Sequence, residues 1–432
     1  MPQELTNAEK VRKLPWALAG DFFNVIYFTI AFAGSTFVLF LSTIGLDTQR
    51  IGVLLAIIPL CGLVAPVVAP VVARIGVRRV FLTLFSLRGF VLVTLVLAPW
   101  VVSNHGSDSG LFFVAVVLIL FALCRSIGEN GLVVWSQEFI PQTIRGKYQA
   151  MQMIVMMTTG ALSVFAVGWV LGDSPTVLKF QIIFGVVFVL GLFCPLLYSR
   201  VHGGEPVRGT TTLPSLSEML VPLKDKRFMR LIGGNAICAL GWMSMASFLP
   251  LFYRDHLGLP ASQIVRVDAA FMIGSLLTCY LWGWAVDRYG SKPVMLLSLS
   301  LHVMFPLSLL LIPRNSPMTF VSMATSAFIL GLICQGWGIG YGRYLFVNII
   351  PADKRSSYTA LHTAWMGLFI GIAPLMAGQL LELTKKFSGQ FGPVHIDPYT
   401  PFFVICVLTV STCVWILSRL PGGGSMNAAR LP

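Results

Sequence analysis

Long apolar runs, separated by short polar segments, dominate the pattern along this chain. Crossing a bilayer core of about 30 Å takes about 20 apolar residues in a helix, and each run is of about that length or longer. Backbone polar groups in hydrocarbon need partners within the protein, so such runs predict helices rather than open sheets. The first six runs lie at about residues 17–44, 50–73, 80–102, 110–138, 147–172 and 177–199, and the second six at about 228–252, 264–286, 293–312, 318–350, 357–381 and 400–420. The pattern predicts twelve transmembrane helices.

The longest polar segment, residues 201–227, separates the two sets of runs. Its glycine, proline and charged residues predict a cytoplasmic linker with one short amphipathic helix. We expect an N-terminal six-helix bundle at residues 1–200, a C-terminal six-helix bundle at 228–420 and a cytoplasmic tail at 421–432. The expected fold class is an all-α membrane protein.

The distribution of lysine and arginine predicts the orientation in the membrane. With the N-terminus inside, about 20 of the 30 basic residues fall on the cytoplasmic side and about seven on the outside. Both termini are therefore expected in the cytoplasm. The first run is too long for a cleaved signal peptide, and no organelle signal is visible, so we expect a multi-pass protein of the cell membrane, most simply the bacterial inner membrane.

The two sets of runs share a local sequence pattern at a constant offset of 210 residues. Ile140-Pro141, Arg145, Tyr148 and Ala150 recur as Ile350-Pro351, Arg355, Tyr358 and Ala360, and Cys124 and Gly128 recur as Cys334 and Gly338. The pattern spans the turn between the fourth and fifth runs of each set. Parallel repeats of this kind are typical of transporters.

Composition excludes several classes of protein. Charged residues make up 11% of the chain, against about 25% in soluble domains, so a soluble globule is excluded. The net charge of +13 is explained by cytoplasmic loops, and no basic groove with stacking aromatic residues is visible, so we expect no nucleic-acid partner. The eight cysteines form no CxxC pair and the six histidines are scattered, so we expect no metal site and no cofactor. No nucleophile and base stand at a useful spacing, so we do not expect an enzyme.

The segment after the eighth run resembles a loop of the major facilitator superfamily. It has the pattern GxxxDRxGxK, formed by Gly283, Asp287, Arg288, Gly290 and Lys292. In that family the same loop also follows the second span. The corresponding segment here keeps the basic residues and the later glycine, but it has alanine in place of the first glycine and of the aspartate. Its retained residues are Arg74, Gly76 and Arg78.

The resemblance implies two pseudo-symmetric six-helix bundles around a cavity at the midplane, which open alternately to the two sides of the membrane. In the family this loop gates the outward-facing state, so the eight residues above are expected to form conformational latches rather than to bind solute. A small residue at Gly283 is expected to allow close helix approach, and Arg288 and Lys292 to hold the loop in the cytoplasm. Ala73, which replaces the aspartate, puts the first latch in doubt.

Two charged residues in the fourth run are the sharpest candidates for proton coupling. Arg125 and Glu129 are one helical turn apart, so their side chains share a face. Charges inside a membrane usually face a partner or a water-filled cavity, and Glu129 is expected to carry a proton as its distance from Arg125 changes. An ion pair that only fixes helix packing is the alternative. Proton-coupled members of the family carry an arginine on this span followed four residues later by glycine, a motif matched by Arg125 but not by Glu129.

Further candidates lie in the first, seventh and tenth runs, which line the cavity in the family. Asp21 is a third proton-coupling candidate, unless it is a helix-start residue stabilised by the helix dipole. The expected cavity residues are Asn24, Tyr27, Asn235, Trp242, Gln335 and Arg343. Two alternatives stay open: Arg343 pairs with Asp21 as a bridge, and Trp242 belongs to the core.

Other polar residues in the runs favour structural roles. Arg88 is expected to reach the interface or to fix a neighbouring helix. His302 and His362 could titrate in a proton path, although packed histidines are the commoner case. The glycine-rich segment 336–342 resembles a phosphate loop, but it lies inside an apolar run and favours close helix packing.

We expect secondary active transport of a small organic solute, driven by protons, in a lipid bilayer and by a monomer. Three arginines against two acids inside the runs favour an anionic or zwitterionic solute taken up by symport. The fifth run lacks the Gly-Pro pair of the family's drug exporters, which also favours uptake. Proton-coupled efflux of drugs or sugars is the alternative, and a receptor or passive channel is the alternative from another class.

Overall fold

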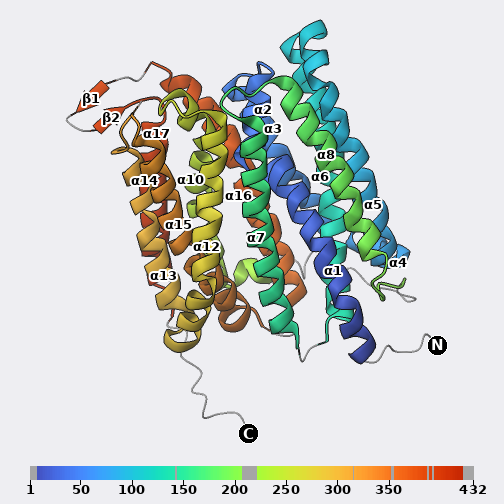
Figure 1. The fold of residues 1–432 in the computed structure, drawn as a ribbon. Helices are drawn as coiled ribbons and strands as arrows, with labels where there is room; N and C mark the ends of the chain where they lie inside the picture. The colour runs from blue at the N-terminus through green and yellow to red at the C-terminus, as the bar shows by residue number, and fades with distance from the viewer. Residues whose placement is uncertain are drawn as a thin grey trace. The chain divides into compact units, whose positions relative to one another are not determined.

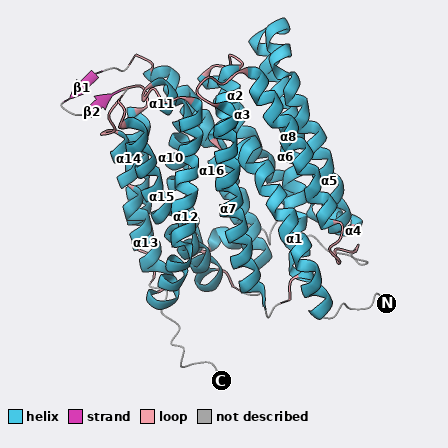
Figure 2. Ribbon diagram, viewed as in Figure 1, coloured by secondary structure: helices cyan, strands magenta, loops and turns pink. Residues whose placement is uncertain are grey.

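Helices make up nearly all of the computed structural model (Figures 1 and 2). The structure describes residues 7–141, 144–206, 221–314, 316–351, 355–386, 389–391 and 394–421. Most of the expected linker helix and of the expected tail lies outside these residues. The part of the linker next to the second set of runs forms a 3-10 turn, η5 (Val221–Lys224).

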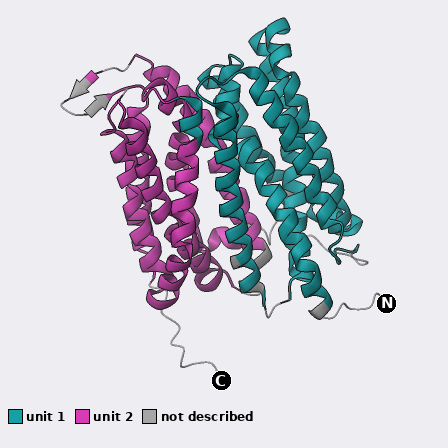
Figure 3. Ribbon diagram, viewed as in Figure 1, with its two compact units in different colours: residues 1–213, 260–265 teal, residues 214–259, 266–432 magenta. Residues whose placement is uncertain are grey.

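The chain divides into two compact units (Figure 3). Unit 1 comprises residues 1–213 and 260–265, and unit 2 comprises residues 214–259 and 266–432. The short piece 260–265 is the beginning of a helix that continues into unit 2. It joins unit 1 through Ser262, whose backbone N–H donates to the carbonyl of Gly172 at 3.1 Å and whose hydroxyl donates to Asp173 at 2.7 Å.

Unit 1 is built from helices that correspond to the first six apolar runs. They are α1 (Asn7–Phe28), η1 (Thr29–Ala33), α2 (Ser35–Thr43), α3 (Thr48–Cys61), η2 (Gly62–Val64), α4 (Ala65–Ile75), α5 (Val77–Val93), η3 (Thr94–Leu97), α6 (Ala98–Phe139), α7 (Arg145–Leu171) and α8 (Val177–Tyr198). Short π and 3-10 segments interrupt several of the spans, as expected where a helix bends.

Unit 2 contains the helices of the second set and one hairpin. They are α10 (Lys226–Ala246), α11 (Leu249–Asp255), α12 (Ala261–Tyr289), α13 (Ser291–His302), α14 (Met304–Leu309), α15 (Thr319–Arg343), η6 (Tyr344–Ile349), α16 (Arg355–Thr384), β1 (Gly389–Phe391), β2 (Val394–Ile396) and α17 (Thr400–Ser418). The strands pair antiparallel, with Gly389 opposite Ile396. The hairpin was not predicted, because three-residue strands leave no periodic signal.

The number of spans agrees with the twelve that the sequence predicts. Ten helices within the described residues are long and apolar enough to cross a membrane, and there are eleven when α3 and α4, bent by 48°, are counted together as one broken span. One of the ten, Val77–Phe139, has 63 residues and would be about 95 Å long, three times a bilayer core. Gly106 breaks it with φ 82° and ψ 170°, a conformation that glycine adopts without strain. Dividing the segment at Gly106 brings the total to twelve.

The repeat is visible where the offset is 210 residues. Helix α7 begins at Arg145 and α16 begins at Arg355, at the two copies of the repeated pattern. The next helices, α8 and α17, begin 223 residues apart (400 − 177), because the β1–β2 hairpin lies before α17. The constant offset therefore holds only around the fourth and fifth spans.

Aromatic packing holds the core of unit 1 together. Phe81 of α5 packs its ring against Trp135 of α6 at 5.9 Å and against Tyr198 of α8 at 5.0 Å, and all three side chains are buried. The Trp135 indole N–H donates to the carbonyl of His202 at 2.9 Å. This bond ties the beginning of the linker to the core.

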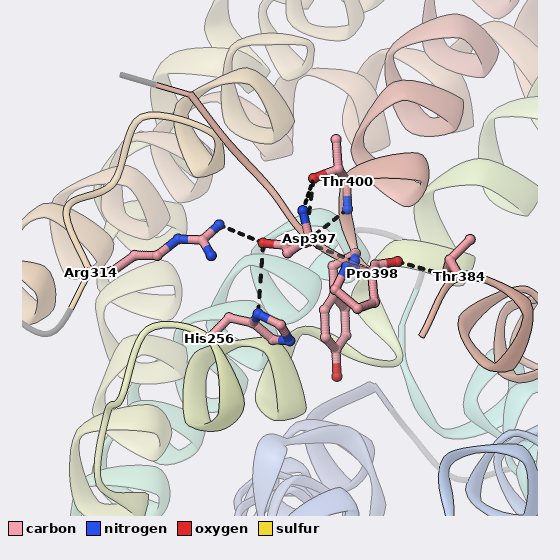
Figure 4. A network of polar contacts seen from close by, with 7 residues as sticks. His256, Arg314, Thr384, Asp397, Pro398 and Thr400 are labelled. Carbon is pink, nitrogen blue, oxygen red and sulfur yellow. Dashed lines mark hydrogen bonds and ion pairs between the residues drawn. The ribbon is translucent and has the colours of Figure 1, made fainter. Parts of the chain in front are cut away.

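A buried carboxylate joins three loops at one end of unit 2 (Figure 4). The Asp397 side chain is 3% exposed and accepts a hydrogen bond from Arg314 at 2.5 Å. Its other oxygen accepts from the backbone N–H groups of Tyr399 and Thr400 at 2.8 and 3.0 Å, next to the beginning of α17. The Nδ1 atom of His256 lies 4.0 Å from the carboxylate. Asp397 thus connects the loops that follow α11, α14 and β2.

The Asp397→Asn substitution is expected to lower the stability of the protein by about 2 kcal/mol, because it removes the negative charge of a carboxylate that is bonded to the largely buried Arg314. The measurement is the thermal unfolding midpoint in detergent. Asp108→Asn is the matched control, because Asp108 pairs with Arg50 at the same 2.5 Å but is 90% exposed. Equal midpoints for the two variants would contradict a structural role for Asp397.

Stability is also expected to depend on the protonation of His256. Burial lowers the pKa of His256 below its ordinary 6.5; Asp397 and Asp255 oppose this shift and Arg314 adds to it. The unfolded chain then binds the proton more readily than the folded protein, so the stabilisation is complete above pH 6.5 and is lost as the pH falls below that value. The unfolding midpoint of His256→Gln should fall less than that of the unsubstituted protein between pH 7 and pH 5. Parallel curves would disprove this.

Candidate functional site

Asp21 lies well inside α1 and is held by two other helices of unit 1. Its side chain is buried, with the residue 5% exposed. One carboxylate oxygen accepts a hydrogen bond from the Tyr198 hydroxyl of α8 at 2.6 Å, and the other accepts from the Gln152 amide of α7 at 2.8 Å. Both donors are neutral, and no ion pair with Asp21 occurs among the described residues. The alternative that Asp21 is a helix-start residue is wrong, because α1 begins at Asn7.

A glycine next to Asp21 makes this contact possible. A Cβ atom on Gly20 would lie 2.5 Å from the ring of Tyr198, so only glycine lets that ring pack against α1. Tyr148, one turn before Gln152 on α7, also has a buried hydroxyl, and this hydroxyl has no hydrogen-bond partner. The three residues on α7 and α8 were missed by sequence reasoning. The sequence signal that could have revealed these partners is Gly20, directly before Asp21 in an apolar run.

Arg125 and Glu129 form the predicted pair on α6. The Arg125 Nε atom donates to Glu129 at 2.8 Å, and the guanidinium lies over the ring of Phe28 at 4.3 Å. The two side chains are 20% and 37% exposed. The carboxylate of Glu129 is thus neutralised by its own helix and is more open to the surroundings than that of Asp21.

Arg88 is fixed inside unit 1 and does not extend to the protein surface. The residue is 1% exposed, and its guanidinium donates to Asn24 at 2.6 Å and stacks over Phe85 at 3.6 Å. The Tyr27 hydroxyl donates to the carbonyl of Arg88 at 3.2 Å, and the Tyr27 ring packs where Gly191 leaves room. Asn24 and Tyr27, expected to line a cavity, therefore serve as partners of Arg88. The interpretation that Arg88 fixes a neighbouring helix is the one that the geometry fits.

The cavity candidates of unit 2 have different surroundings. Asn235 of α10 is 3% exposed; its amide nitrogen contacts the sulfur of Met366 at 3.2 Å, and its amide oxygen has no partner. Trp242 packs its ring against His302 at 5.5 Å and is half-buried. Gln335 is half-buried on α15. Arg343 forms an ion pair with Asp287, so the alternative pairing with Asp21 is wrong.

The family loop of unit 2 forms a set of contacts at the ends of α12, α13 and α17. Besides the Asp287–Arg343 pair, Arg288 lies over the Trp284 ring at 5.4 Å. Gly290 makes the turn between α12 and α13 with φ 91°. Lys292 donates to the carbonyl of Ser418, the last residue of α17, at 2.8 Å and to that of Leu420 at 2.5 Å.

The expectation for Gly283 is wrong. A Cβ atom there would meet nothing within 4 Å, so this glycine is not a site of close helix approach. The close approach between α12 and α15 lies at Gly274 and Gly331, where a Cβ atom would lie 2.3 and 2.1 Å from the carbonyls of Phe328 and Phe271.

The corresponding turn of unit 1, between α4 and α5, has the glycine and the basic side chain but lacks the ion pair. Gly76 turns the chain between α4 and α5 with φ 104°, and Arg78 donates to the carbonyl of Ser199 at 2.5 Å, at the end of α8. Arg78 thus corresponds to Lys292, since each follows the glycine turn by two residues and satisfies carbonyls that the last helix of its unit leaves open. Arg74 is exposed. The ion pair has no counterpart, because alanine stands at 73 and valine at 133.

Among the described residues, no group of three histidine, cysteine, aspartate or glutamate side chains could hold a metal ion.

Comparisons with known proteins place the chain in a family. The model of the Major Facilitator Superfamily matches residues 23–265 and 231–430. Protein ZINC INDUCED FACILITATOR-LIKE 1 of Arabidopsis thaliana is 30% identical over 160 residues, 36% of this chain and 32% of that protein. Probable nitrate/nitrite antiporter NarK1 of Thermus thermophilus is 21% identical over 239 residues, 53% of this chain and 50% of that protein. The matches thus span no more than half of the length of these two relatives.

Solved structures share the fold over nearly the whole chain. A crystal structure of the nucleoside transporter NupG has a TM-score of 0.68 at 14% identity, covering 95% of this chain and 98% of that one. The xylose transporter XylE from E. coli, in a partially occluded inward open conformation, has a TM-score of 0.65 at 13% identity, covering 96% and 98%. At these identities the likeness shows the fold alone. With twelve predicted spans, the latch loop and a family match over most of its length, the chain belongs to the major facilitator superfamily, whose members are membrane transporters rather than enzymes.

Proposed function

We propose that this transporter couples movement of its solute to protons and that Asp21 carries the proton. The observation that supports Asp21 most strongly is its pair of neutral donors, Tyr198 and Gln152, in a buried setting. An ionised carboxylate in an apolar interior is costly unless a cation or a proton neutralises it. Glu129 already has Arg125 as its cation, whereas Asp21 has none among its described partners.

Proton binding at Asp21 would change the contacts of three helices. As a carboxylate, Asp21 accepts one hydrogen bond on each oxygen. A proton on either oxygen turns that oxygen into a donor. Tyr198 can accept the proton on its side by rotating its hydroxyl, and the Gln152 amide nitrogen, which only donates, then faces the oxygen of a neutral carboxyl group instead of a carboxylate. Hydrogen bonds to a neutral acceptor are weaker than charge-assisted ones, so protonation weakens the contact between α1 and α7 and links the proton to helix movement.

The three arginines inside the spans do not favour an anionic solute once their partners are known. Arg88 is bonded to Asn24, Arg125 to Glu129 and Arg343 to Asp287, so each has a described partner. We retain proton-driven uptake by symport as the proposed direction, supported by the lack of a Gly-Pro pair in α7. We also propose a monomer in the bacterial inner membrane with both termini in the cytoplasm, supported by the excess of basic residues on that side.

Asp21→Asn is expected to abolish proton-driven accumulation and to leave solute exchange intact, because asparagine keeps hydrogen-bonding capacity but cannot bind and release a proton. The measurement uses proteoliposomes, an imposed pH gradient and a panel of labelled sugars, nucleosides, amino acids and organic acids. Exchange without a gradient, measured on the same vesicles, controls for folding and solute binding. Full accumulation by Asp21→Asn would disprove the assignment, and flux without accumulation in the unsubstituted protein would indicate a passive channel.

Glu129→Gln is expected to keep at least about half of the proton-driven accumulation, because the ion pair that it removes lies within one helix and is partly exposed. It is the matched comparison for Asp21→Asn, since each variant exchanges one carboxylate for an amide. If Glu129→Gln loses accumulation while Asp21→Asn retains it, the proton belongs to the Arg125–Glu129 pair instead.

A further inference from the structure

Buried polar atoms without partners gather among aromatic rings in unit 2. The amide oxygen of Asn235 on α10, the Nε2 atom of His302 on α13 and the indole N–H of Trp337 on α15 are all buried and lack hydrogen bonds. An unpaired polar atom in a protein interior is costly in free energy, so native proteins contain few such atoms. Three such atoms on three neighbouring helices therefore call for an occupant.

Ring contacts connect these residues into one cluster. His302 packs against Trp242 at 5.5 Å and against Trp337 at 6.0 Å, measured between ring centroids. Trp337 lies 6.5 Å from Tyr341, whose hydroxyl is 2.8 Å from Nε2 of His362 on α16. We call these five residues, together with Asn235, whose side chain interacts with the Tyr341 hydroxyl, the aromatic cluster. Trp242, Trp337 and His362 are half-buried, so the cluster is not sealed on every side.

The hydrogen-bonding roles of the unpaired atoms are determined by their neighbours. The Nδ1 atom of His302 lies 2.7 Å from the carbonyl of Ser298, which can only accept, so Nδ1 carries the hydrogen. The neutral ring then presents Nε2 as an acceptor. The Asn235 oxygen is a second acceptor, and the Trp337 indole is a donor. The cluster offers two acceptors and one donor, beside flat apolar faces.

No formal charge lies along the stretches of helix that hold the cluster; the charges of these helices, such as Lys292 and Arg343, stand at their ends. Residues 231–253, 293–313, 319–342 and 356–381 contain no lysine, arginine, aspartate or glutamate. In unit 1, by contrast, Asp21, Arg88, Arg125 and Glu129 all lie inside spans. An ion entering the cluster would lose its hydration without meeting a counter-charge, so the setting favours an uncharged occupant.

We propose that the aromatic cluster binds the transported solute and that this solute is an uncharged, hydroxylated ring compound, a class that includes sugars and nucleosides. Ring hydroxyls donate to Asn235 and to Nε2 of His302, and a hydroxyl or ring oxygen accepts from the Trp337 indole. The faces of Trp242 and Trp337 cover the apolar side of the ring. This assignment rests on the proposed transport function. It implies that the proton binds in unit 1 and the solute binds in unit 2.

The test is solute binding to the purified protein in detergent, measured by calorimetry without any gradient. The probes are D-xylose, D-glucose, uridine and adenosine as uncharged compounds, and nitrate, lactate and glutamate as ions. Trp337→Phe keeps the ring but removes the indole N–H, so it should weaken binding of the uncharged ligand by about tenfold or more. Trp365→Phe is the matched control: its indole N–H is also buried and unpaired, but its ring packs against Phe369, outside the cluster, at 5.3 Å. It should change the dissociation constant by less than about twofold.

Several outcomes would overturn the assignment. One is a folded protein, with an unshifted thermal midpoint, that binds none of the uncharged probes at millimolar concentration. Another is an ion that binds with the same affinity in Trp337→Phe, and a third is an equal loss in Trp365→Phe and Trp337→Phe. Because binding needs no proton gradient, these outcomes do not bear on the proton role of Asp21. That role is tested by the accumulation assay in proteoliposomes. A sugar and a nucleoside are distinguished by which probe binds.

Discussion

A polar group placed inside hydrocarbon must find its partner within the protein, and this constraint shapes the whole molecule. It makes the twelve apolar segments helical. It also accounts for the partners of the charges in unit 1: Arg88 is met by Asn24 and two aromatic rings, and Arg125 by Glu129. Asp21, like Arg88, is met only by neutral groups, but a guanidinium keeps its charge whereas a carboxylate can be neutralised by a proton. A proton is a partner that can bind to the Asp21 carboxylate and leave it reversibly.

The two units satisfy the open carbonyls at the end of their last helices with corresponding residues, but they differ in their other polar contacts. Each has a glycine turn followed two residues later by a basic side chain, Arg78 or Lys292, that satisfies carbonyls at the end of the last helix of its unit. Only unit 2 adds the Asp287–Arg343 pair. The spans of unit 1 carry charges in their interior, whereas the stretches of helix that hold the aromatic cluster of unit 2 carry none. The asymmetry fits a transporter whose proton and solute are bound by different halves.

Sequence patterns predicted the features that depend on short distances along the chain. The apolar runs gave the spans, and the spacing of four gave the Arg125–Glu129 pair, because one helical turn brings such residues together. Gly76 and Gly290 were recognised within a loop pattern that requires a turn. The partners of Asp21 could not be predicted in this way, because Gln152 and Tyr198 are 131 and 177 residues away. The prediction for Gly283 was wrong for the same reason. Which glycine allows close approach depends on where the neighbouring helix crosses, and α15 crosses α12 at Gly274.

The central claim is that the proton resides on Asp21, and infrared difference spectroscopy of the protein in lipid tests it without knowledge of the solute. Lowering the pH should produce a band of a protonated carboxyl group. The account predicts that this band is absent from Asp21→Asn and present in Glu129→Gln. A band that persists in Asp21→Asn and disappears in Glu129→Gln would contradict it.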